Sequence, residues 1–102
     1  MNPIETSIQS IIYLCKKHKV KNLYVFGSVL TNRFSPDSDI DFLVEFENLP
    51  PEEYADNYFA FSNSLSGLLK REIDLLELKG IKNSVLLNNI NRTKKQLYGG
   101  IC

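Results

Sequence analysis

The alternation of apolar and polar residues predicts three short β-strands. Residues 39–46 change from polar to apolar with a period of two, which is typical of a strand with one face against a core. Residues 23–26 form a compact apolar run and residues 72–78 a short alternating one, and they predict two further strands. Residues 94–98 predict a fourth, short strand at the edge of the same sheet.

Three other segments repeat with a helical period. We expect helices over residues 3–18, 51–69 and 84–92, because their apolar residues recur every three or four positions. The first helix ends in a basic run that includes His18, the only histidine, and positive charge there suits a helix C-terminus. The aromatic stripe of the second helix is interpreted as core, with Phe59 left over for a partner interface.

Strands interspersed with helices predict an α/β (α+β) fold. We expect a short mixed β-sheet with helices packed on one face and acidic side chains on the other. The length predicts one domain over residues 1–102, in which residues 98–102 form a flexible tail.

Three aspartates are the candidate chemical groups. Asp39 and Asp41 share one face of their strand, with Cα atoms roughly 6.5 Å apart. Two carboxylates so close repel each other, and a divalent cation such as Mg²⁺ removes that repulsion. Asp74 can stand beside them on a neighbouring strand, and Glu72 shares its face as a weaker candidate. Three carboxylates can hold two metal ions. The alternative is that Asp39 and Asp41 are simply solvated and that Asp74 is an edge-strand charge that resists aggregation.

Gly27 and Ser28 form a turn directly after the first strand. Glycine permits a sharp turn or a close approach to a ligand, and serine is a good N-cap for a short helix over residues 29–32. Backbone N–H groups at such a helix N-terminus bind phosphate. By itself this pair is a common turn, and its value comes from its spacing to the aspartates across a turn signature at residues 36–38.

The combination resembles a known superfamily. Gly27-Ser28, ten intervening residues, Asp39-x-Asp41 and a later strand with Asp74 are similar to the signature of the DNA polymerase β-type nucleotidyltransferases. The wording PDSDIDFLVEF and the small size resemble the minimal nucleotidyltransferases (MNT), which are encoded beside HEPN-domain partners in toxin–antitoxin systems. Many relatives have a small residue at Leu30 and a glycine at Asn32, so the nucleotide pocket is expected to differ in shape here.

The resemblance implies a reaction and a set of roles. Gly27 and Ser28 would hold the triphosphate of ATP, and Asp39 and Asp41 would carry two Mg²⁺ ions. Asp74 would help to bind a metal ion and would assist deprotonation of the acceptor. The implied activity is AMPylation, the transfer of AMP from ATP to a hydroxyl, which in this group is a tyrosine of a HEPN ribonuclease toxin.

The composition indicates which kinds of binding partner and which cellular compartment to expect. Twelve acidic and twelve basic residues give no net charge, which argues against a nucleic-acid binder. Cys15 and Cys102 form no disulfide framework or metal-binding spacing, which suggests the reducing cytoplasm. We expect neither a secretion leader nor a membrane-spanning segment.

Two other functions remain open from the sequence. The chain can be a non-catalytic antitoxin that neutralises its partner by contact, or a small-molecule nucleotidyltransferase. The latter usually needs additional mass to hold its acceptor, which 102 residues do not provide. The sequence leaves the acceptor, the preferred base, the number of nucleotides transferred and self-association undecided.

Overall fold

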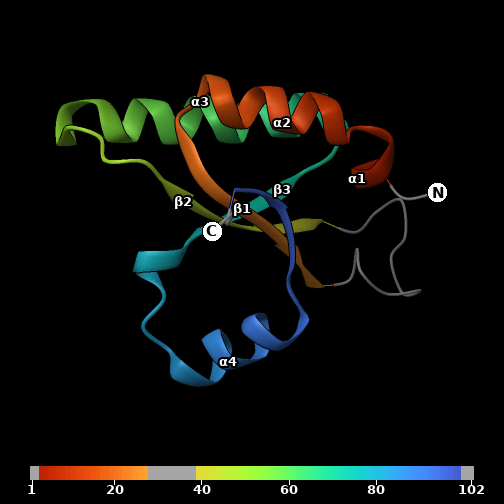
Figure 1. Ribbon diagram of the computed structural model, residues 1–102, viewed down its shortest axis with the longest axis vertical. Coiled ribbons are helices and arrows are strands. Elements are labelled where there is room, and N and C mark those ends of the chain that lie inside the picture. The colour runs from red at the N-terminus through yellow and green to blue at the C-terminus, as the bar shows by residue number, and fades with distance from the viewer. Residues whose placement is uncertain (1–2, 28–38, 100–102) are drawn as a thin grey trace.

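The computed structural model describes residues 3–27 and 39–99 (Figure 1). The described chain has strands interspersed with helices, as predicted. In chain order its elements are α1 (Pro3–Thr6), α2 (Ile8–Lys17), β1 (Val20–Phe26), β2 (Ile40–Phe46), α3 (Pro51–Leu69), β3 (Ile73–Glu77), the 3₁₀ turn η2 (Leu78–Gly80), α4 (Ser84–Thr93) and β4 (Lys95–Tyr98).

The four strands form one mixed sheet in the order β3-β2-β1-β4. Strand β1 is antiparallel to both β2 and β4, whereas β2 and β3 run parallel. The predicted short mixed sheet is therefore confirmed. The parallel pair needs a crossover connection, which α3 provides.

Helices α2 and α3 lie together on one face of the sheet (Figure 1). The core lies between these helices and the sheet, and its fully buried side chains include Phe42, Phe61, Ile11, Leu23 and Leu65. The helical cover predicted for one face is thus present. Helix α4 lies on the other side of the sheet (Figure 1), where Ile90 is buried.

The N-terminal helix departs from its prediction. Residues 3–18 were expected as one helix, but a turn at Ser7 separates α1 from α2. The Ser7 N–H donates to the Ile4 carbonyl at 3.2 Å, a three-residue bond that closes the short first helix. The apolar stripe continues across the break, because Ile4, Ile11 and Cys15 are all buried.

His18 also differs from its prediction. Its side chain is 8% exposed and lies 5.7 Å from the Phe61 ring, centroid to centroid. Burial first, and then the Lys17 charge, lower the pKa of His18 below its ordinary value. The imidazole is therefore neutral at neutral pH and adds no positive charge to the end of α2, so that part of the interpretation is wrong.

Several predictions fall outside the described residues. These concern Ser28, the short helix over residues 29–32 with Leu30 and Asn32, the turn at residues 36–38, and the tail beyond Gly99 with Cys102. Cys15 is a free, buried thiol whose pKa burial raises to about 12. None of the helices in the described ranges combines the length and the apolar character that crossing a bilayer requires.

Candidate active site

Strand β2 positions Asp41 at the centre of the candidate site. The neighbouring residues Ile40 and Phe42 are fully buried, whereas Asp41 is only partly buried. Side chains alternate along a strand, so the buried pair holds β2 in place and Asp41 projects from the opposite face. The local sequence therefore sets the direction of the carboxylate.

Asp74 stands directly beside Asp41 on the neighbouring strand. The parallel register pairs the two residues, and neighbouring strands lie about 4.8 Å apart. Asp39 immediately precedes β2 and is exposed. The structure therefore brings together the aspartates of two segments that are separated by more than thirty positions in the sequence.

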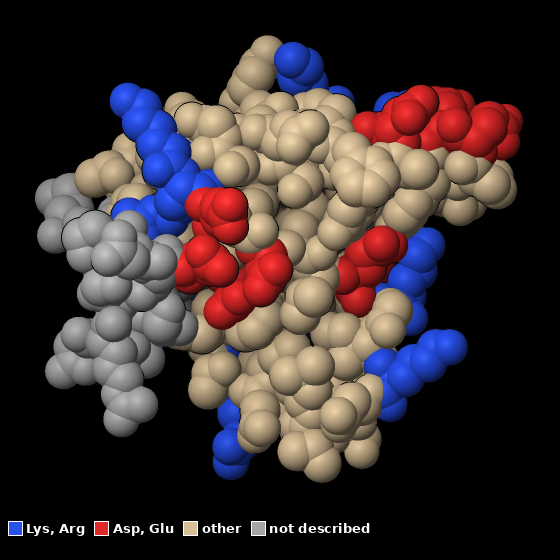
Figure 2. Space-filling view, turned by 180° about the vertical axis from the view of Figure 1, so that it is seen from behind, with Lys and Arg blue, Asp and Glu red and all other residues tan. Residues whose placement is uncertain are grey.

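The three aspartates act on one another electrostatically. The pKa of Asp41 is raised above its ordinary value of 3.8, first by burial and then by the negative charges of Asp74 and Asp39. A raised pKa means that the folded protein disfavours the ionised form of the carboxyl group when no cation is bound. Figure 2, which views the molecule from behind, shows acidic side chains gathered in patches on that face. A positive charge beside Asp41 would relieve the repulsion.

The donor set fits a magnesium ion that is shared with a substrate. Within residues 3–27 and 39–99, no three His, Cys, Asp or Glu side chains already form a group able to hold a metal ion. Mg²⁺ is commonly bound by one or two carboxylates together with substrate phosphates. Asp41 and Asp74, with Asp39 nearby, meet that lesser requirement and supply the hard oxygen ligands that this ion prefers.

Gly27 lies against the Asp41 carboxylate at the end of β1. Its φ of +84° belongs to the left-handed region, and its neighbour Phe26 pairs with Asp41 across the sheet. A Cβ atom at Gly27 would collide with an Asp41 carboxylate oxygen. The glycine therefore serves both the turn and the space around the acid. Ser28, which follows it, lies outside the described residues.

Tyr58 is a supporting residue that the sequence did not single out. Its hydroxyl donates to the Leu75 carbonyl at 2.6 Å and so connects α3 to β3, the strand that carries Asp74. Tyr58 belongs to the aromatic stripe that was interpreted as core, and it does pack against the core. Helical spacing shows that a tyrosine faces inward but gives no partner for its hydroxyl.

Glu72 contributes through its backbone. The Ile40 N–H donates to the Glu72 carbonyl at 3.4 Å, which begins the pairing of β2 with β3. The Glu72 side chain is exposed. Its part in the described structure is to align the two strands that carry Asp41 and Asp74.

Comparison with known proteins identifies the family. The family described as "Polymerase beta, Nucleotidyltransferase" matches residues 9–100. The chain belongs to this nucleotidyltransferase family. The matched range contains Gly27, Ser28, Asp39, Asp41 and Asp74.

Curated relatives of this nucleotidyltransferase come from Methanocaldococcus jannaschii. The putative protein adenylyltransferase MJ0128 is 39% identical over 77 residues, which cover 76% of each chain. The putative protein adenylyltransferase MJ1379 is 31% identical over 74 residues, covering 72% of this chain and 73% of the relative.

Solved structures share the fold. A putative minimal nucleotidyltransferase superposes with a TM-score of 0.76 and is 26% identical, covering 93% of this chain and 95% of its own. A toxin–antitoxin crystal structure with AMP-PNP gives a TM-score of 0.71 at 26% identity, covering 91% of this chain and 73% of the other. The fold is that of a minimal nucleotidyltransferase.

Proposed function

We propose that this nucleotidyltransferase transfers AMP from ATP to a hydroxyl group of a partner protein. The carrying observation is the parallel register that sets Asp41 beside Asp74 next to Gly27. Support for ATP and for a protein acceptor comes from the relatives, which include protein adenylyltransferases and a complex with AMP-PNP.

Each residue has a defined part in this proposal. The acceptor oxygen attacks the α-phosphorus of ATP, the bond from that phosphorus to the bridging oxygen breaks, and pyrophosphate leaves. Asp39 and Asp41 would hold two Mg²⁺ ions, and Asp74 would help to hold one of them and would accept the proton of the acceptor hydroxyl. When bound, Mg²⁺ neutralises the phosphate charge that develops during transfer. Gly27 and Ser28 bind the triphosphate through backbone N–H groups and the serine hydroxyl.

The proposed acceptor is a tyrosine of a HEPN ribonuclease toxin, which AMPylation silences. This assignment follows from the MNT resemblance and is supported by the toxin–antitoxin complex among the structural neighbours. The chain then acts as the antitoxin in the cytoplasm. The balanced charge of twelve acids and twelve bases suits a protein acceptor better than a nucleic acid.

Paired variants on one strand test the transfer. Asp41 and Glu45 lie on β2 with the same side-chain direction, one at each end, and both are partly buried. Purified protein is incubated with the HEPN partner, ATP and Mg²⁺, and AMP additions are counted by intact-mass spectrometry. We expect Asp41→Asn to reduce transfer about 100-fold or more, the scale for losing a transition-state electrostatic contact, and Glu45→Gln to retain it.

Two results would contradict the proposal. Wild-type turnover by Asp41→Asn would remove the metal-binding role from that residue. An unmodified partner, combined with equal protection of cells by wild type and Asp39→Asn, would show that the chain neutralises by contact alone.

Ser28→Ala tests the proposed triphosphate binding separately. We expect the affinity for ATP to weaken by about 1.5–3 kcal/mol, the value of a hydrogen bond to a charged group.

A further inference from the structure

The β4 edge of the sheet lies beside a helical stripe. Among the described residues, β4 is paired only with β1, so its other edge faces away from the sheet. Ile8, Ile12 and Lys16 recur every four positions along α2, and positions four apart share a helix face, while Ile4 of α1 lines the same hollow as Ile8. This stripe and β4 line the same hollows.

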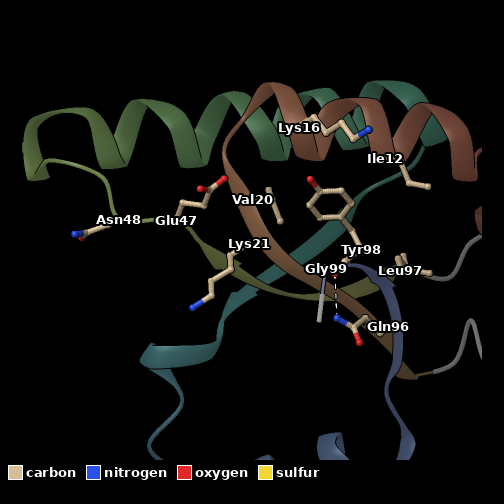
Figure 3. A pocket seen from close by; sticks show the side chains of 10 residues that line it. All are labelled: Ile12, Lys16, Val20, Lys21, Glu47, Asn48, Gln96, Leu97, Tyr98 and Gly99. Carbon is tan, nitrogen blue, oxygen red and sulfur yellow. Dashed lines mark hydrogen bonds between the residues drawn. The ribbon is translucent and has the colours of Figure 1, made fainter. Parts of the chain in front are cut away.

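Two hollows follow the β4 edge. One of about 950 Å³ lies between α2 and the end of β4, and it extends past the start of β1 to the segment after β2; its lining is Ile12, Lys16 and residues 20–21, 47–48 and 96–99. One of about 340 Å³ lies between Ile4, Glu5, Ile8 and residues 95–97. Figure 3 shows Ile12 and Lys16 projecting from α2 on the side where the Tyr98 ring rises from β4. We call this combined depression the β4-edge groove. An extended chain between a helix and a strand edge is a common mode of peptide recognition.

The rim of the β4-edge groove carries one more lysine than it does glutamates. Lys16, Lys21 and Lys95 are exposed at it, against Glu5 and Glu47. Its apolar part is formed by Ile8, Ile12 and Leu97, whose side chains are only partly buried. An occupant therefore needs apolar side chains on one side and negative charge on the other.

We propose that the β4-edge groove binds an extended segment of a partner protein in which apolar and acidic residues alternate. Such a segment would add a strand to β4, place its apolar side chains beneath α2 and meet the lysines with its acids. A second copy of this chain fits less well, because its β4 edge brings the same lysine surplus, and edge lysines oppose pairing of like strands. Docking here is independent of AMP transfer.

Binding of a defined peptide tests this inference. The probe is a fluorescein-labelled nonapeptide of alternating valine and glutamate with blocked ends, and its anisotropy is followed as full-length protein is added. We expect saturable binding that shifts the backbone NMR signals of residues 95–98. We expect Lys95→Glu to weaken it about fivefold, the upper range for one exposed ion pair. Lys82→Glu, which reverses an exposed charge outside the groove, should leave it unchanged.

A second pair of variants tests the apolar part of the groove. Ile12→Glu should abolish measurable binding, whereas Tyr13→Glu, next along α2 and 64% exposed, should not affect it. Circular dichroism checks that both variants remain folded. If Ile12→Glu unfolds the protein, the Lys95→Glu comparison still decides the question.

Several outcomes would overturn the inference. These are equal binding of a valine–lysine peptide, equal losses in Lys82→Glu and Lys95→Glu, or absence of signal shifts in β4. Light scattering that shows a dimer dispersed by Lys95→Glu would make a second copy the occupant. The Asp41→Asn protein should bind the peptide as tightly as wild type. A protein without AMP transfer can therefore still bind the peptide, and the two proposals can fail separately.

Discussion

The two edges of the sheet are built differently. At the β3 edge, Tyr58 and Tyr54 of α3 donate to the Leu75 carbonyl and to the Glu77 carboxylate, so the strand that carries Asp74 is fastened to the helix above it. At the β4 edge, α2 stands beside the strand with hollows between them. Transfer chemistry requires fixed carboxylates, whereas docking requires an edge that is free to pair. The same small sheet offers one of each.

Substitutions at two glycines should have the largest effect and test whether the candidate active site and the β4-edge groove differ in function. Gly27 and Gly99 both have positive φ, +84° and +83°, and both follow a strand. Alanine at Gly27 would press on the Asp41 carboxylate, whereas alanine at Gly99 would press on the Lys21 carbonyl. We expect Gly27→Ala to lower AMP transfer about 100-fold, the scale for a misplaced catalytic geometry. Transfer per folded molecule should be retained in Gly99→Ala.

Stability provides the control for the glycine pair. Both variants should lose roughly 1–3 kcal/mol of unfolding free energy in urea, the usual cost of a strained backbone conformation. Gly67→Ala, at an exposed position of α3 with open space around it, should instead gain about 1 kcal/mol from helix propensity. Equal transfer by Gly27→Ala and Gly99→Ala would show that the Asp41 contact is unimportant.

The sequence predicted the elements because their signals are local. Period-two alternation placed Asp41 on the face opposite Phe42, and helical spacing placed α3 at residues 51–69, as observed. The position of Asp74 on a neighbouring strand was also anticipated, and the register confirms it. The roles of the site residues in catalysis stay predictions.

What the sequence did not predict depends on long-range packing. His18 follows a basic run, yet Phe61 from α3 covers it, and nothing near His18 in the sequence indicates that. The turn at Ser7 separates two helices within one uninterrupted apolar stripe. The Tyr58 hydroxyl found its partner on a strand seventeen residues away. In each case the deciding neighbour lies on another element.

The fastening of the β3 edge is tested by Tyr58→Phe. The substitution removes the donor to the Leu75 carbonyl and keeps the ring that packs against the core. We expect the unfolding free energy in urea to fall by about 0.5–1.5 kcal/mol, the net value of one hydrogen bond. Transfer should fall by less than in Gly27→Ala, because Asp74 remains in place.

Tyr13→Phe is the control for the loss of a hydroxyl. Tyr13 is 64% exposed on α2, away from β3, so its variant should match wild type in both stability and transfer. If Tyr58→Phe also matches wild type, the hydroxyl does not fasten the edge.

The repulsion around Asp41 is tested by comparing the melting temperatures of Asp41→Asn and wild type as a function of pH, in EDTA so that no metal ion is bound. The folded state raises the pKa of Asp41 above its ordinary value of 3.8, so the folded protein holds this proton more tightly than the unfolded chain. Stability contributed by Asp41 is therefore lost as pH rises through and above that value. We expect Asp41→Asn to melt a few degrees higher than wild type at pH 7, with the difference vanishing below pH 3.8.

Glu45→Gln at the other end of β2 should behave oppositely. The Glu45 carboxylate accepts a bond of 2.8 Å from the Asn22 side chain. A glutamine oxygen can still accept this bond but lacks the charge that strengthens it, so we expect a slightly lower melting temperature at pH 7. Equal shifts in both variants would mean that crowding of the aspartates does not act on Asp41.

The smallest expected effect concerns the residue that leads α3 into the β3 segment. Lys70 caps α3 in the left-handed conformation with a φ of 56°, which costs a non-glycine residue about 1–2 kcal/mol. Lys70→Gly removes that strain but gives the unfolded chain more freedom, so we expect a net gain of about 0.5 kcal/mol in urea. Because Asp74 keeps its position, transfer should not change. A loss of stability would show that contacts of the Lys70 side chain stabilise the connection between α3 and β3.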